Sequence, residues 1–130
     1  MWYGWPMARV ILLFTGIAFL MISLQVTIFH YRQNFRHWAM LGPVIEGPVL
    51  GLLTIMLAFY YTPALRSLTI VLLFVGVVSG LAGTVLHVNG IGQRVGGYGE
   101  SQNYLTGPPL TLPLMVAALS VLGLIALYWR

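Results

Sequence analysis

Few residues of this 130-residue chain could carry chemistry, and they fall in a small number of places. The three histidines and one of the two carboxylates could together form a polar site. Two imidazoles held at one level of a helix bundle could ligate a b-type haem, and nearby arginines could meet its propionates. The residues that we take as a candidate cofactor site are His30, His37, Glu46, His87 and Arg94.

Other ligands are compatible with the same residues. Imidazole and carboxylate bind iron, copper or zinc, so His30, His37, His87 and Glu46 could hold a metal, although no H-x-x-H or E-x-x-H spacing supports it. A quinone could dock where an apolar groove meets a few hydrogen-bond donors. Haem b, a metal ion and a quinone therefore remain open as cofactors, against the simpler interpretation that these are ordinary interfacial side chains.

Several classes of chemistry are excluded by composition. The chain has no cysteine, no aspartate and no lysine, which removes thiolate catalysis, iron–sulfur clusters and cysteine-ligated zinc. No nucleophilic triad is visible, so we expect no catalytic residues and no enzyme activity from the chain alone. The six arginines are scattered rather than gathered on one basic face, which argues against nucleic acid as a partner and favours contact with lipid headgroups.

The elements that must position these residues are four long apolar stretches. Charged residues make up 6% of the chain, far below the roughly 25% of a soluble domain. A helix of about 20 apolar residues crosses the hydrocarbon layer of a bilayer. We therefore predict a multi-pass integral membrane protein of a prokaryotic inner (cytoplasmic) membrane, one domain with spans at about 10–29, 43–61, 67–87 and 110–129.

The predicted fold is an all-α, up-down antiparallel bundle of four transmembrane helices with both termini on the same side. The other side, which we call side B, holds residues 30–42 and 88–109, and with them the histidines and Glu100. The run 10–29 is too long for a signal peptide, so we expect it to be a retained span. No internal repeat is evident.

Glu46 is the carboxylate that lies inside a predicted span, about two helical turns below side B. A carboxylate at that depth is costly unless it is paired or protonated. It could be a proton relay, a metal ligand or an acid that contacts a quinone. We give more weight to a structural ion pair that holds the Pro43–Pro48 break in place, with a partner among Arg32, Arg36, Arg94, His30, His37 and His87.

Small residues recur at helical spacing in the third predicted span. A face of this kind lets another helix approach closely, which matters in lipid because the hydrophobic drive for helix association is lost there. The partner could be another span of this chain or a helix of a neighbour. The residues of the predicted packing face are Gly76, Ser79, Gly80 and Gly83.

These observations favour a small accessory or structural subunit of a larger membrane protein complex, respiratory or otherwise redox-active. Its partners would be the lipid bilayer and other membrane protein subunits. The first alternative is a subunit that binds haem b, a metal or a quinone at the side B cluster. The second is a small transporter or proton pathway that uses Glu46.

Overall fold

The computed structural model describes residues 2–129, which are helical with no strand among them. Four helices are long and apolar enough to cross a membrane, as the sequence predicts. Arg130, the last of the scattered arginines, lies outside the described residues. The elements are α1 (Met7–Arg32), η1 (Trp38–Met40), α2 (Leu41–Phe59), α3 (Pro63–Gly92), η2 (Gly97–Gly99), α4 (Ser101–Thr106) and α5 (Thr111–Tyr128).

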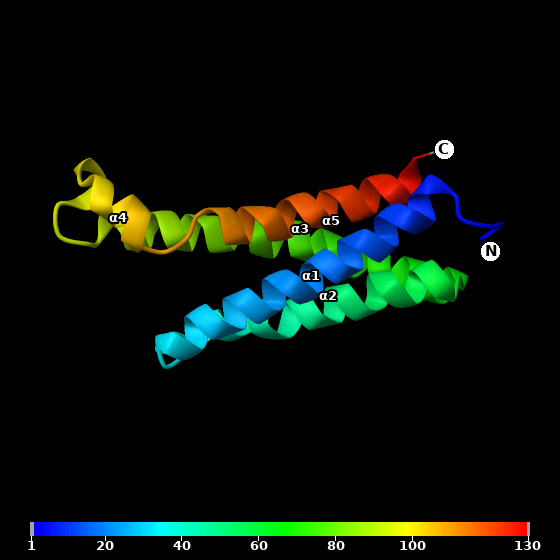
Figure 1. Cartoon of the computed structure of the whole chain (residues 1–130), viewed down its shortest axis with the longest axis horizontal. Helices are drawn as coiled ribbons and strands as arrows, with labels where there is room; N and C mark the ends of the chain where they lie inside the picture. The colour runs from blue at the N-terminus through cyan, green and yellow to red at the C-terminus, as the bar shows by residue number, and fades with distance from the viewer. Residues whose placement is uncertain (1, 130) are drawn as a thin grey trace.

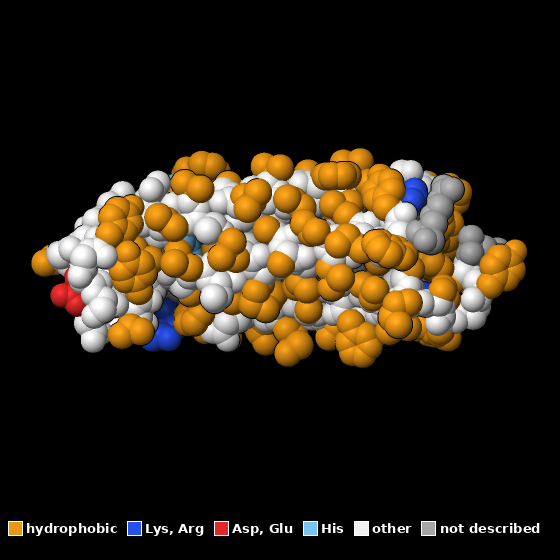
Figure 2. Space-filling model, turned by 90° about the horizontal axis from the view of Figure 1, so that it is seen from above, with side chains coloured by type: hydrophobic (Ala, Val, Ile, Leu, Met, Phe, Trp, Pro, Cys, Tyr) orange, Lys and Arg blue, Asp and Glu red, His pale blue; other side chains and the backbone are white. Residues whose placement is uncertain are grey.

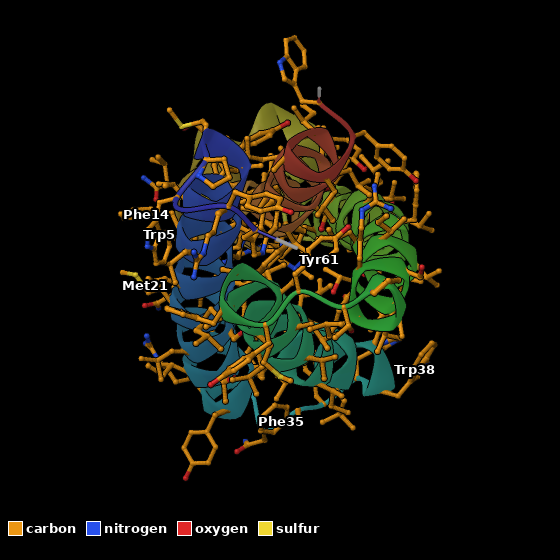
Figure 3. All side chains as sticks on the ribbon, turned by 90° about the vertical axis from the view of Figure 1, so that its right-hand side faces the viewer. Trp5, Phe14, Met21, Phe35, Trp38 and Tyr61 are labelled. Carbon is orange, nitrogen blue, oxygen red and sulfur yellow. The ribbon has the colours of Figure 1, made fainter. Side chains whose placement is uncertain are left out.

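The long helices form two hairpins, one of α1 and α2 and one of α3 and α5, because the most extensive helix–helix contacts lie within these pairs. The seams α1/α5 and α2/α3 join the two hairpins. Seen end-on, the four helices follow one another around the bundle in the order α1, α2, α3, α5 (Figure 3). The start of α1 and the end of α5 lie at one end of the molecule, and the hairpins diverge toward the other (Figure 1).

Small residues bring the helices of each hairpin into close contact. In the α1/α2 hairpin, a Cβ atom added to Gly51 would lie 2.7 Å from Leu20 Cδ2, and one added to Gly47 would overlap Ser23 Oγ. In the α3/α5 hairpin, a Cβ added to Gly80 would lie 2.6 Å from the backbone nitrogen of Ala117. Glycine is required at these positions because no side chain fits between the helices.

The face predicted from Gly76, Ser79, Gly80 and Gly83 is divided between two neighbours. The three glycines pack against α5 of the same chain: the closest atoms to an added Cβ belong to Ser120 at Gly76, to Ala117 at Gly80 and to Pro113 at Gly83. Ser79 turns to α2 instead. The helix that covers the glycine face is therefore one of the chain's own spans.

Helix α2 passes through the segment from Pro43 to Pro48, where the sequence suggests a break. It runs without interruption from Leu41 to Phe59. Pro43 lies in the first turn, where the missing N–H group costs no helical hydrogen bond. Pro48 is inside the helix and offers no N–H group to the carbonyl of Val44, four residues earlier.

Helix α3 extends beyond its predicted end near residue 87 and stops at Gly92. Its last turn is held by tertiary packing, because Ile91 is buried and the ring of Tyr98 lies directly on Gly92. Residues 88–109, expected to be a loop, contain this last turn together with η2 and α4. The buried Asn103 amide fixes the segment by donating to the carbonyls of Val95 (3.0 Å) and Gly97 (2.8 Å).

The outer surface is apolar along most of its length. Figure 2 shows hydrophobic side chains spread over the face in view, with charged side chains visible only toward its two ends. Phe14 and Met21 point away from the bundle on α1 (Figure 3), and they are 65% and 68% exposed. Such a surface is suited to lipid rather than to water.

The glycine packing of α3 on α5 is tested by Gly80→Ala. The added methyl would meet backbone atoms of α5, so the helices must separate, and we expect a loss of about 1–3 kcal/mol of unfolding free energy. The matched control is Gly42→Ala, also in a helix, where nothing lies within 4 Å of an added Cβ. Equilibrium unfolding in mixed micelles measures both, and equal midpoints for the two variants would contradict the packing.

Candidate functional site

Glu46 and Ser79 form a polar pair between the two hairpins. Ser79 Oγ lies 2.7 Å from Oε1 and 2.6 Å from Oε2 of Glu46, and so donates its hydrogen bond to the carboxyl group. Glu46 is carried by α2 and Ser79 by α3, and both side chains are partly buried. The pair lies within the apolar length of the bundle, where each polar group needs a partner from the protein.

The structural ion pair expected for Glu46 is not formed. Within residues 2–129 no salt bridge joins Glu46 to an arginine or histidine, and its side-chain partner is Ser79. Arg32, Arg36 and Arg94 are exposed near the side B end. The neutral hydroxyl of Ser79 is therefore the partner of Glu46, where the sequence predicts a cation.

A small cavity lies beside Glu46. It is about large enough for one water molecule. Helices α1, α2 and α5 enclose it, with mostly apolar side chains. Its lining residues are Phe19, Ile22, Ser23, Val26, Pro43, Glu46, Gly47 and Val116. Glu46 therefore borders this cavity as well as bonding Ser79.

His30 and His87 are held in the same way. His30 Nδ1 lies 2.9 Å from the carbonyl oxygen of Met40, and His87 Nδ1 lies 2.5 Å from that of Pro109. A carbonyl oxygen only accepts, so Nδ1 carries the proton in both rings, and in the neutral form Nε2 keeps a free lone pair. Histidines that bind metals are anchored by such second hydrogen bonds.

His37 differs from the other two histidines. It is exposed, its Nδ1 accepts a hydrogen bond from the Ala39 amide (3.2 Å), and its ring stacks on Trp38. Over the described part of the chain, no group of three or more His, Cys, Asp or Glu side chains is placed to hold a metal ion. His30, His37, His87 and Glu46 do not converge into the metal site considered from the sequence.

Two arginines have a role that the sequence did not indicate. Arg9 Nε donates to the carbonyl of Ala58 (2.5 Å) at the end of α2, and Arg66 Nη2 donates to the carbonyl of Leu127 (2.9 Å) at the end of α5. Arg9 also lies over the ring of Trp5, 3.7 Å from its centroid. Each arginine lies near the start of the first helix of a hairpin and binds the end of the second helix. The sequence predicted only contact with lipid headgroups for these side chains.

Comparison with known proteins adds no identification: no protein family, characterised protein or solved structure matches the chain.

The Glu46–Ser79 hydrogen bond is tested by Ser79→Ala. Removing the hydroxyl leaves a partly buried carboxyl group without its donor, which we expect to cost about 1–3 kcal/mol of unfolding free energy. Ser101→Ala, at an exposed position on α4, is the control and should change stability by no more than about 0.5 kcal/mol. An unfolding midpoint for Ser79→Ala equal to that of the control would show that the bond contributes nothing.

Proposed function

We propose that this protein is a small accessory or structural subunit of a larger membrane protein complex, respiratory or otherwise redox-active. Its four long helices cross a prokaryotic cytoplasmic membrane as an up-down antiparallel bundle. Both termini lie on one side of that membrane, and side B lies on the other. The partners are lipid and other membrane subunits.

The closed interior of the bundle carries this proposal. Glycines let the helices of each hairpin approach until no side chain fits between them. Most polar side chains within the helices bond the backbone of their own helix, as Ser23, Thr54 and Ser120 do. Among residues 2–129, Thr15 Oγ1 alone is a buried side-chain polar atom without a partner. An interior packed in this way favours a scaffold over a transport pathway.

The apolar outer surface supports the same role. Apolar side chains such as Phe14 and Met21 on α1 and Val78 on α3 are more than half exposed. Lipid can cover all of this surface, and so can the helices of other subunits. Because the chain uses little polar chemistry of its own, its contribution is best explained by the surfaces that it offers to neighbours.

The proposal is tested by tagging the chain and extracting source membranes in mild detergent. We expect the tagged chain to migrate on native gels in a complex much larger than itself, and deletion of the chain to lower the amount of that complex. His37→Ala should leave assembly unchanged, because the His37 ring is exposed and bonds only the neighbouring Ala39 amide. Migration of the chain only as a monomer would refute the proposal.

A second candidate function is a cofactor-binding subunit, and the matched anchoring of His30 and His87 favours it. Both rings have Nδ1 bound to a main-chain carbonyl and Nε2 free to act as a ligand. Two such histidines on different helices are sufficient axial ligands for a haem. Arg94, near the same end of the molecule, could meet a propionate.

Absorbance spectroscopy after incubation with haemin tests this second function. If His30 and His87 are axial ligands, the protein shows a Soret band that is lost in both His30→Ala and His87→Ala. His37→Ala is the matched control and should keep the band, because His37 is exposed and anchored differently. A spectrum without a Soret band, or one unchanged in both histidine variants, would exclude haem ligation by this pair.

A further inference from the structure

Within each hairpin, an arginine at an equivalent position joins the two helices. Arg9 bonds the carbonyl of Ala58, and Arg66 bonds the carbonyl of Leu127. Arg66 follows Arg9 by 57 positions, and Leu127 follows Ala58 by 69 positions. In each hairpin, the arginine at the start of the first helix therefore binds the end of the second helix.

The histidines repeat this relation at the other end. His30 bonds the carbonyl of Met40, and His87 bonds that of Pro109. His87 again follows His30 by 57 positions, and Pro109 follows Met40 by 69. The end of the first helix is thus joined to the start of the second at equivalent residues in both hairpins.

The helices between these ties also correspond. Thr27 and Thr84, 57 positions apart, each bond the carbonyl four residues earlier. With the offset of 69, five buried positions of α2 correspond to five buried positions of α5. In α2 these are Gly47, Gly51, Thr54, Leu57 and Ala58, and in α5 they are, in the same order, Val116, Ser120, Gly123, Ala126 and Leu127. The two hairpins thus correspond at these ties and buried positions, a relation that is not evident in the sequence alone.

Because the hairpins correspond, the residues of the α2/α3 seam can be compared with those at equivalent positions of the α1/α5 seam. Exchanging the halves carries α2/α3 onto α5/α1, an arrangement seen in membrane proteins built from parallel repeats. Glu46 then corresponds to Met115 and Ser79 corresponds to Ile22. The same position is polar in one seam and apolar in the other, so packing of the halves does not itself require a carboxyl group or a hydroxyl.

We propose that Glu46 and Ser79 are the docking point for a partner transmembrane helix that carries a basic side chain within the hydrocarbon layer. The proposal rests on the proposed role as an accessory subunit and names the chemistry of its partner. Within residues 2–129 no cation pairs with Glu46. Arg9 and Arg66 bond the ends of α2 and α5, and Arg32, Arg36 and Arg94 are exposed near the side B end without pairing with Glu46. The complementary charge would therefore come from another chain.

The residues that flank Glu46 and Ser79 leave the outer side of the α2/α3 seam open to a neighbouring helix. On α2, Gly42 and Val49 flank Glu46 at helical spacing, and both are exposed, with open space at Gly42. On α3, Val75 and Ala82 flank Ser79 in the same way and are also exposed. The α2/α3 seam is less extensive than α1/α5. Gly42 and Ala82 are small residues of the kind that line helix contacts in lipid.

The first test copies the apolar seam onto the polar one. Glu46→Met combined with Ser79→Ile replaces both members of the pair by the residues at the equivalent positions. We expect the double variant to fold with an unfolding midpoint equal to or above that of the unchanged chain, since replacing both partners leaves no unpaired polar group. A midpoint below that of Ser79→Ala would show that the pair is structural and would overturn the proposal.

The second test measures association in vesicles by energy transfer. The cysteine-free chain accepts one dye at Ser101→Cys. The probes are synthetic leucine–alanine helices of about 20 residues that carry either arginine or leucine about two turns from one end. We expect the arginine helix to bind about tenfold more tightly than the leucine helix, which corresponds to about 1.4 kcal/mol.

Matched variants assign this preference to the site. It should vanish in Glu46→Met/Ser79→Ile and persist in Glu100→Gln, which removes the chain's other carboxylate side chain. Equal binding of the two helices by the unchanged chain would overturn the proposal.

The same variants in native membranes separate this inference from the proposed function. We expect the double variant to be folded but lost from the larger complex, while Glu100→Gln remains in it. A complex that assembles normally around the folded double variant would refute the docking point and leave the subunit role intact. Absence of any larger complex would refute the subunit role itself.

Discussion

The free energy needed to place a polar group in hydrocarbon is the constraint on which this structure depends. Helix ends, hydroxyls and carboxyl groups inside a bilayer must find partners within the protein. The chain meets this need with side chains that cross from one helix to the next. Arg9 and Arg66 bind carbonyls at one end of the hairpins, and His30 and His87 do so at the other. These ties also fix how far each helix slides along its partner.

With both ends of each hairpin tied, the middle can pack through small residues. Gly51 and Gly80 mark the places where helices approach most closely, and such packing supplies much of the association energy that the hydrophobic effect supplies in water. Glu46 stands out against this background because its only side-chain partner in the described structure is a serine. The equivalent position in the other half is Met115, and within residues 2–129 no cation pairs with Glu46.

The sequence predicts the four spans well because the length of an apolar run depends only on the thickness of the bilayer. It also places Glu46 inside the second apolar helix, since that follows from the position of the residue along the sequence. It does not give the partner of Glu46, because the rotation of α2 relative to α3 is set by packing between helices. The predicted end of α3 near residue 87 is wrong for a similar reason. Tertiary burial of Ile91 stabilises a last helical turn that its glycines do not favour.

The repeated architecture escaped detection because packing in lipid conserves the size and position of side chains more than their identity. Ser120 stands where the other half has Gly51, and Gly123 stands where it has Thr54. All four are small and buried, but they score as unrelated when letters are compared. The arginine, threonine and histidine that do recur are widely spaced, so they indicate a repeat only once their equivalent hydrogen bonds are seen.

The helices of each hairpin differ in length, and this has a consequence for the surrounding lipid. Helices α1 and α3 have 26 and 30 residues, whereas α2 and α5 have 19 and 18. At about 1.5 Å per residue, the shorter pair reaches only about 27–29 Å, slightly less than the roughly 30 Å of an average hydrocarbon layer. The mismatch is relieved by thinning of the adjacent leaflets or by tilting of the longer helices. An increase in acyl-chain length would thus strain the bundle, and the strain would be greatest at the shorter helices, α2 and α5.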